Sequence, residues 1–247
     1  MKLKVFGTGS KGNAYALTDS KGNTLLIEAG MPIKLVKEYL DFDMSKIVGC
    51  LLSHSHGDHC KYVNKYLSAG IDVYMSEETS KEIENLNKQR VKILKPNLNV
   101  RLGKEFRIRP FLVEHDVECY GFQIYHKECG KIVFLTDAYY CKYLFQGLNN
   151  IIIEANYSEE ILKEKIKAGK SNKHVRSRVI HSHMSLETCK YTLELNDLSK
   201  VNNIVLIHLS ETNSNAEKFK KEISELTGKN VVVAENGLEM DFNKTSF

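Results

Sequence analysis

The sequence has no tryptophan, and only three prolines and six cysteines among its 247 residues. The cysteines show no CxxC spacing and are too sparse for a disulfide framework, so we expect reduced thiols. No apolar run approaches the roughly 18 residues that a membrane-spanning helix needs, and Gly7 interrupts the N-terminal segment before a signal-peptide core develops. These absences predict a soluble, cytoplasmic protein with no membrane partner.

Neither sign of charge is in large excess, because 35 basic and 31 acidic side chains leave a formal net charge of +4. That balance permits a ligand with phosphate groups without requiring one. One stretch is more basic than the rest, which indicates either a solvated helix and loop or a surface that faces phosphates. Its cationic residues are Lys163, Lys165, Lys167, Lys170, Lys173, Arg176 and Arg178.

Short β-type runs between turn residues recur in both halves of the chain, and each half has its own helical segments. We expect one α/β domain over residues 1–247, with two sheets packed face to face, helices outside and an antiparallel meander at the start. The predicted strands are Leu3–Phe6, Ala14–Thr18, Thr24–Glu28, Ile47–Leu52, Asp72–Met75, Phe106–Val113, Gly121–His126, Lys131–Leu135, Asn150–Glu154, Ile204–Ile207 and Val231–Ala234. The predicted helices are Pro32–Leu40, Ser76–Lys88, Ser158–Ala168, Ser185–Leu195 and Ala216–Thr227.

The most informative segment follows a buried strand and reads Ser-His-Ser-His-Gly-Asp-His over residues 53–59. His54 and His56 are two residues apart on an extended chain, so they point to the same side and both imidazoles can reach one metal ion. The glycine allows a sharp turn, after which Asp58 and His59 can present a carboxylate and an imidazole to a second ion. The segment therefore predicts part of a two-metal site.

A two-metal site needs further ligands, and three residues at the ends of predicted strands can supply them. His115, Asp137 and His208 each follow a buried strand. Taken singly, each has an alternative reading as a satisfied core histidine or a turn aspartate. Together they repeat one arrangement, a ligand just past the C-terminal end of a strand. The predicted ligands are His54, His56 and His115 for one ion and Asp58, His59 and His208 for the other, bridged by Asp137.

The segment 53–59, followed in order by His115, Asp137 and His208, resembles the HxHxDH pattern and later motifs of the metallo-β-lactamase superfamily over nearly the whole chain. The resemblance implies an αββα sandwich of two mixed β-sheets flanked by helices, with the metals at one edge between the sheets. It also implies two divalent metal ions, Zn²⁺ first and Mn²⁺ as the alternative. An aspartate at 137, where β-lactamases more often have cysteine, is typical of the phosphodiesterase branch, similar to tRNase Z.

Further motifs resemble two groups of that branch, the YycJ/WalJ nucleases and the phage anti-Pycsar phosphodiesterases, which destroy cyclic nucleotide signals. The family usually has aspartate where this chain has Glu28, a residue expected to orient the metal ligands from behind. The resemblance also implies a homodimer in which the neighbouring protomer can contribute to the site. The motifs are Gly7–Asn13, Leu26–Gly30, Ile153–Asn156, His183–Ser185 and His208–Ser210.

Phosphodiester hydrolysis needs an activated water and a proton for the leaving alkoxide. Asp58 is predicted to act in catalysis as well as in metal binding. Resemblance to tRNase Z implies His183 as the proton donor and Glu154 as its orienting carboxylate, whereas the alternative for His183 is a residue that only flanks a helix. The early glycines predict a tight turn near the metals rather than a phosphate-binding loop, and Ser10 and Asn13 in that turn are candidate substrate contacts.

These residues predict a metal-dependent phosphodiesterase that hydrolyses 3′,5′-cyclic nucleotides, such as cCMP and cUMP, through a hydroxide activated by two metals. This would be an anti-Pycsar activity, exercised in the host cytoplasm if a phage encodes the protein. The alternative is a nuclease of YycJ/WalJ type, a 5′–3′ exonuclease that acts on DNA or RNA. A glyoxalase II-like thioester hydrolase uses the same ligands on the same fold, and a non-catalytic, metal-stabilised module is a further alternative.

Overall fold

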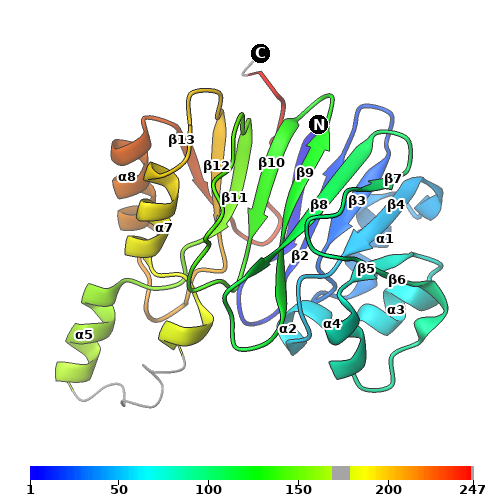
Figure 1. Ribbon diagram of the computed structural model, residues 1–247, viewed down its shortest axis with the longest axis horizontal. Coiled ribbons are helices and arrows are strands. Elements are labelled where there is room, and N and C mark those ends of the chain that lie inside the picture. The colour runs from blue at the N-terminus through cyan, green and yellow to red at the C-terminus, as the bar shows by residue number, and fades with distance from the viewer. Residues whose placement is uncertain (169–178, 246–247) are drawn as a thin grey trace.

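Two seven-stranded β-sheets pack face to face, with helices on their outer sides (Figure 1). This computed structural model describes residues 1–168 and 179–245. The architecture confirms the predicted sandwich of two mixed sheets flanked by helices. Within the described residues, no helix is both long enough and apolar enough to cross a membrane.

The first sheet has the strand order β14-β1-β2-β3-β4-β5-β6. Strands β1, β2 and β3 form the expected antiparallel meander, and β3 to β6 run parallel to one another. One strand breaks the division of the chain into halves, because β14 returns from the C-terminal region to pair with β1. The strands are β1 (Lys2–Gly7), β2 (Ala14–Thr18), β3 (Thr24–Ile27), β4 (Ile47–Leu51), β5 (Val73–Met75), β6 (Val91–Ile93) and β14 (Glu239–Asp241).

The second sheet has the order β13-β12-β11-β10-β9-β8-β7. Its antiparallel part runs from β7 to β10, and its parallel part from β10 to β13. The short strands β6, β7 and β14 were not predicted, since each has a charged side chain among its three residues, whereas the equally short β5 is uncharged and was predicted. The strands are β7 (Val100–Leu102), β8 (Phe106–Val113), β9 (Cys119–His126), β10 (Gly130–Leu135), β11 (Asn150–Glu154), β12 (Asn203–Ile207) and β13 (Asn230–Val233).

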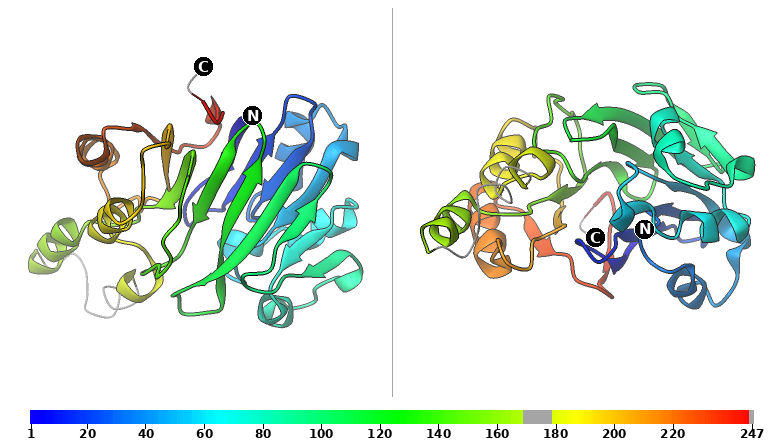
Figure 2. Two further views of the ribbon diagram at one scale, coloured as in Figure 1. Left: turned by 45° about the horizontal axis from the view of Figure 1, so that its top comes forward. Right: turned by 90° about the horizontal axis from the view of Figure 1, so that it is seen from below.

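Helices cover only part of the outer faces. Figures 1 and 2 show α7 and α8 beside β11 to β13, and α1, α3 and α4 beside the first sheet. No helix of the described residues lies over the outer face of β8 and β9 in these views. The helices are α1 (Ile33–Tyr39), α2 (Gly57–Cys60), α3 (Val63–Ser68), α4 (Glu77–Glu82), α5 (Glu159–Lys167), α7 (Leu186–Glu194) and α8 (Ala216–Thr227).

The prediction of one helix over Ser76–Lys88 is wrong in its second half, because α4 ends at Glu82. Asn85 takes a positive φ of 53°, and the Asn87 side chain accepts a hydrogen bond from the backbone of Gln89 to begin a 3₁₀ turn. Short amide side chains compete with the helix for backbone hydrogen bonds, and this competition outweighs the helical spacing of the apolar residues.

Side chains that alternate along the strands build the core in layers. In β10, Ile132 and Phe134 point into the space between the sheets, whereas Val133 and Leu135 point outward into the layer that contains α7 and α8. This is the period of two expected for a strand that is covered on both faces. The buried sandwich holds β10, β11 and β12 in parallel register, so that the residues after these strands meet at one edge. All six cysteines are buried and unpaired in this packing.

Candidate metal centre

The 53–59 segment carries its polar side chains from the end of β4 into α2. His54 is fully buried, and its Nδ1 lies 2.8 Å from Ser53 Oγ. His56 has extended dihedral angles just before α2, and its carbonyl accepts a hydrogen bond from the backbone N–H of His59. The short helix therefore brings Asp58 and His59 into the same space as the two preceding histidines.

Three non-glycine residues at the centre have a positive φ, namely Glu28 (65°), Asp137 (46°) and His208 (56°). Each lies one or two residues past the end of a strand, β3, β10 or β12. L-amino acids with side chains adopt this region rarely, and such residues persist where the surrounding structure holds them, often at functional sites. The strained turns aim these three polar side chains at one edge of the sandwich.

The seven predicted ligands lie together in two groups that share Asp137. In each group, one ligand atom from every member lies within 4.8 Å of the others. The first group is His54, His56, His115 and Asp137, and the second is Asp58, His59, Asp137 and His208.

The two carboxylate oxygens of Asp137 face different groups. Oδ2 lies 3.9 Å from Nε2 of His54, whereas Oδ1 lies 3.3 Å from Nε2 of His59 and 3.7 Å from Nε2 of His208. In the second group, Nε2 of His208 lies 3.1 Å from Oδ2 of Asp58. A carboxylate in this position has one oxygen available to each of two neighbouring cations.

The donor atoms fit a divalent metal ion. His54 Nε2 is buried and has no hydrogen-bond partner among the described residues, although it points into the cluster. Leaving a buried polar atom unpaired costs stability, and a metal ion would satisfy this nitrogen. Imidazole and carboxylate donors suit Zn²⁺ and Mn²⁺ alike, so the donor set does not select between them.

The pKa values of the cluster are shifted in opposite directions. Burial lowers the pKa of His54 well below its usual value, which keeps the imidazole neutral. Burial also opposes charge on His59, but the carboxylates of Asp137 and Glu28 outweigh it and raise the pKa of His59 well above normal. Burial alone would raise the pKa of Asp137, yet the neighbouring histidines, above all His208, hold it well below the usual range. The Asp137 carboxylate is therefore ionised, as metal binding requires.

Glu28 lies behind the second group, where its family counterpart is expected. It is fully buried, and its Oε2 lies 3.5 Å from Nδ1 of His59, on the side of the ring away from Asp137. A carboxylate at this position orients the imidazole and strengthens it as a ligand.

Glu154 and His183 form a pair beside the cluster. The Nδ1 atom of His183 lies 2.8 Å from Oε1 of Glu154, whose other oxygen accepts hydrogen bonds from the backbone N–H groups of Ala138 (3.3 Å) and Met184 (3.1 Å). Burial lowers the pKa of His183, but Glu154 more than compensates and raises it to about 9. Because Nδ1 is engaged, Nε2 is the nitrogen that remains for a ligand in the pocket.

A pocket of about 420 Å³ opens over the cluster. Ser10 lines it, whereas Asn13 is fully buried beneath, with Nδ2 3.1 Å from Nε2 of His59 and its backbone N–H donating to the carbonyl of Asp58. The roles of Ser10 and Asn13 as substrate contacts stay predictions. The pocket is lined by Ser10, His56, Gly57, Asp58, Asp116, Asp137, Ser182, His183 and His208.

Two residues at the centre were not given a role by the sequence analysis. Asp116 follows His115, and its Oδ1 lies 3.0 Å from Nε2 of His115 and 3.5 Å from Nε2 of His56. Asn156 follows β11, and its Nδ2 lies 3.0 Å from Nδ1 of His208. Their positions directly after a ligand and after a strand end were the available signals, but neither residue type is selective enough to indicate a metal site.

The basic stretch remains largely outside this description. Lys170, Lys173, Arg176 and Arg178 lie outside the described residues, as does His174. Of the others, Lys163 pairs with Glu159 at 2.9 Å, one turn away on α5. Lys165 donates hydrogen bonds to Thr212 and Asn213, so neither of these two lysines is directed at the pocket.

Several solved structures share this fold over nearly the full length of both chains. The metallo-beta-lactamase fold protein YhfI from Bacillus subtilis has a TM-score of 0.72 at 17% identity, and covers 97% of this chain and 98% of its own. Zn²⁺-bound PqqB from Methylobacterium extorquens has a TM-score of 0.73 at 13% identity, with 98% and 100% covered. The short form of human tRNase Z has a TM-score of 0.62 at 15% identity, with 98% and 99% covered. At these identities the likeness shows the fold.

The sequence itself gives a family assignment. A search of curated proteins finds no match. The family model described as the beta-lactamase superfamily domain, by contrast, matches residues 25–209, a range that begins in β3 and ends just after His208. This range contains all seven predicted ligands as well as Glu154 and His183. The chain belongs to the beta-lactamase superfamily domain family and has the metallo-β-lactamase fold of its hydrolases.

Proposed function

We propose that this protein is a phosphodiesterase that uses two divalent metal ions, with Zn²⁺ as the first choice. The observation that carries the proposal is the position of Asp137, whose two oxygens face separate groups of histidine and carboxylate donors. A structural metal site would need only one closed group of ligands. Two groups that share a carboxylate are typical of hydrolases that act on phosphate esters.

In this proposal the residues divide into ligands and a proton donor. His54, His56 and His115 would hold one ion, Asp58, His59 and His208 would hold the other, and Asp137 would be shared by the two groups. When bound, the ions supply an activated water and neutralise charge on the phosphoryl oxygens. Asp58 and Asp137 face the pocket and orient the groups that react there.

His183 is the proposed general acid for the leaving alkoxide. Glu154 holds Nδ1, which leaves Nε2 directed to the pocket, and the pKa of about 9 keeps the imidazole protonated at neutral pH. A donor that begins protonated can transfer its proton as the bond to the leaving oxygen breaks. The backbone N–H groups of Ala138 and Met184 keep Glu154 in place, so the acid is positioned before substrate binds.

The first proposed substrate class is a 3′,5′-cyclic nucleotide such as cCMP or cUMP. The pocket volume of about 420 Å³ is in the range of small-molecule sites and supports a ligand with the dimensions of a mononucleotide. The resemblance to anti-Pycsar enzymes supports the same class. We also propose the homodimer that this resemblance implies, which sedimentation of the purified protein tests.

The second proposed class is a polynucleotide, cleaved as by the YycJ/WalJ nucleases. An observation favours it independently of the pocket, since arginines that make no ion pair with the described residues line a separate hollow on the outer face of the second sheet. The likeness to tRNase Z, at the level of fold, is compatible with this class as well.

The test is hydrolysis by metal-loaded protein of three substrates in parallel, a set of 3′,5′-cyclic nucleotides, end-labelled single- and double-stranded DNA and RNA, and a glutathione thioester. Asp137→Asn serves as the blank for each. Turnover of a phosphodiester that Asp137→Asn abolishes supports the proposal, and the substrate cleaved selects the class. Turnover of the thioester alone would overturn it in favour of a glyoxalase II-like hydrolase.

A further inference from the structure

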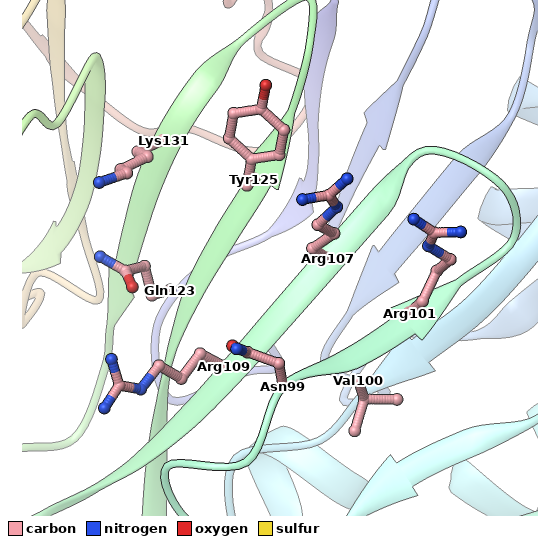
Figure 3. Close-up of a pocket in the computed structure, with 8 residues that line it drawn as sticks. All are labelled: Asn99, Val100, Arg101, Arg107, Arg109, Gln123, Tyr125 and Lys131. Atoms are coloured by element: carbon pink, nitrogen blue, oxygen red, sulfur yellow. The ribbon is translucent and has the colours of Figure 1, made fainter.

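A row of cationic and aromatic side chains crosses the outer face of the second sheet. Strand register places Arg101 of β7 opposite Arg107 of β8, Arg107 opposite Tyr125 of β9, and Tyr125 opposite Lys131 of β10. Arg109 and Gln123 form a second cross-strand pair beside this row. Figure 3 shows these side chains rising from the strands around one hollow. We call this surface the arginine face; it comprises Arg101, Arg107, Arg109, Gln123, Tyr125 and Lys131.

The arginine face carries positive charge without compensation. No aspartate or glutamate lines its hollow, and its four cations make no ion pair with the described residues. Cations elsewhere on the surface are commonly paired, for example Arg90 with Asp72 at 3.1 Å and Lys127 with Glu105 at 3.2 Å. The chain has six arginines and 29 lysines, so three arginines within nine residues of sequence are a marked concentration.

The cross-strand pairing of arginines lowers the stability of the fold. A surface that keeps such a cost is expected to bind an anionic ligand. Like charges directly opposite each other on neighbouring strands repel, and Arg101 faces Arg107 with no carboxylate between them. Arginine differs from lysine in presenting a planar fork of donors that matches two oxygens of a phosphate group. Three such forks on a rigid sheet form a surface that complements phosphate groups.

The hollow on the arginine face is an extended groove and not a compact pocket. It has a volume of about 520 Å³ and continues into a second hollow of about 320 Å³, with Arg109, Gln123 and Lys131 common to both. The row from β7 to β10 crosses three strand spacings, or about 14 Å. One exposed apolar side chain, Leu144, lines the second hollow and is 67% exposed. These dimensions suit a polymer with several phosphates better than a single free anion.

We propose that the arginine face binds single-stranded nucleic acid, with backbone phosphates at the arginines and a base against Tyr125. Tyr125 is 40% exposed, and the guanidinium carbon of Arg107 lies 5.7 Å from the centre of its ring. Proteins that bind single strands combine a cationic groove with aromatic side chains on which unpaired bases stack. An acidic peptide would use the charges but would gain little from the aromatic ring.

This site is separate from the metal centre. The chain from Arg109 to His115 continues for six residues, which at a strand rise of about 3.3 Å per residue corresponds to about 20 Å. A cyclic mononucleotide in the pocket does not reach this far, whereas a strand of several nucleotides does. The inference deepens the polynucleotide class of the proposed function, but binding is measured without turnover, so the failure of one does not imply failure of the other.

The experiment is fluorescence anisotropy of a labelled 20-nucleotide single strand with the full chain in EDTA, over a range of salt concentrations. The variant Arg101→Gln/Arg107→Gln should weaken binding at least about tenfold at low salt, and should reduce the slope of log affinity against log salt by about 1.4, or 0.7 for each lost phosphate contact. Tyr125→Ala should weaken binding several-fold with little change in that slope.

Lys65→Gln/Lys220→Gln is the matched control, because it removes the same charge from exposed positions on α3 and α8. The control should bind within about twofold of the original protein. Equal losses in the two double variants would overturn the proposal, and so would unchanged binding in Arg101→Gln/Arg107→Gln. Displacement of the strand by polyglutamate as readily as by unlabelled nucleic acid would also overturn it, and would assign the face to acidic peptides.

Discussion

The metal centre and the arginine face differ in how their charged side chains are paired. At the centre, each carboxylate lies against imidazoles, as Asp137 does between His54 and His59, and the site is buried where strands end. On the arginine face, four cations lie exposed in the middle of regular strands with no acid among them. The centre is therefore organised internally before anything binds, whereas the face lacks its counter-charge. This difference indicates an organised reaction site and a surface completed by an anionic partner.

The sharpest test of the centre is Asp137→Asn, which keeps the shape of the side chain and removes the shared charge. We expect hydrolysis of the substrate to fall by about 10³-fold or more, since both groups of donors lose a ligand. Metal content measured by mass spectrometry should fall below two ions per chain. The exposed residue Asp197 offers a control, Asp197→Asn, in which both quantities should stay unchanged. Two ions retained with full turnover would contradict the shared-ligand assignment.

Removal of the proposed acid should have the next largest effect. His183→Ala should lower kcat by about 10²-fold, the usual contribution of a positioned general acid. Glu154→Gln should lower kcat less and should shift the alkaline limb of the pH profile to lower pH, because the carboxylate is what raises the pKa of His183 to about 9 and the acid must be protonated to act. The nearby His181→Ala should be without effect. Additive losses in the double variant would argue against a coupled pair.

Asp116 tests how far the centre extends beyond the predicted ligands. Its carboxylate lies 3.0 Å from His115 and 3.5 Å from His56, so Asp116→Asn should weaken metal binding at the first group. We expect a loss of affinity of about tenfold, as for other residues that support metal ligands. Competition with a chromogenic chelator measures this without any substrate. Unchanged affinity would show that Asp116 does not support the metal ligands.

Glu128 is a paired charge that lies away from both regions, and it shows how much one such group contributes to the free energy of unfolding. Glu128 accepts hydrogen bonds from the Ser20 hydroxyl and the Met1 ammonium, and although burial opposes its charge these partners lower its pKa to about 2. Glu128→Gln should reduce the free energy of unfolding by about 1–2 kcal/mol at pH 7. Because the folded pKa is depressed, this contribution is complete above the ordinary pKa of 4.5 and is lost as the pH falls toward 2. Urea unfolding at pH 7 and pH 3 measures it, and an equal difference at both would contradict the assignment.

The smallest expected effect has the opposite sign. Arg101→Gln should raise the free energy of unfolding by about 0.2–1 kcal/mol at low salt, since it removes repulsion from Arg107. Arg101→Lys keeps the charge and should show no such gain. Urea unfolding at two salt concentrations checks this, because screening should reduce the difference. A loss of stability in Arg101→Gln would mean that this arginine has a stabilising role in the fold.

Much of the candidate centre could be predicted from local patterns. His54, His56, Asp58 and His59 are neighbours in sequence, and strand geometry and one glycine suffice to place them together. His115, Asp137 and His208 were found by their position after apolar runs, because parallel strands present their ends at one edge. The structure brings all seven together, while their roles as ligands remain predictions. Asp116 escaped notice because one more carboxylate beside a histidine is not a distinctive signal.

The sequence by itself determined the strand and helix pattern of a two-sheet sandwich and the set of polar side chains at its strand ends, because both depend on short-range periodicity. The tertiary structure decided which strands are neighbours. Only the pairing of β7, β8, β9 and β10 places Arg101, Arg107, Tyr125 and Lys131 in one row. It also returned β14 to the first sheet. Register between distant strands is set by the packing of side chains across the whole sandwich, which no single segment encodes.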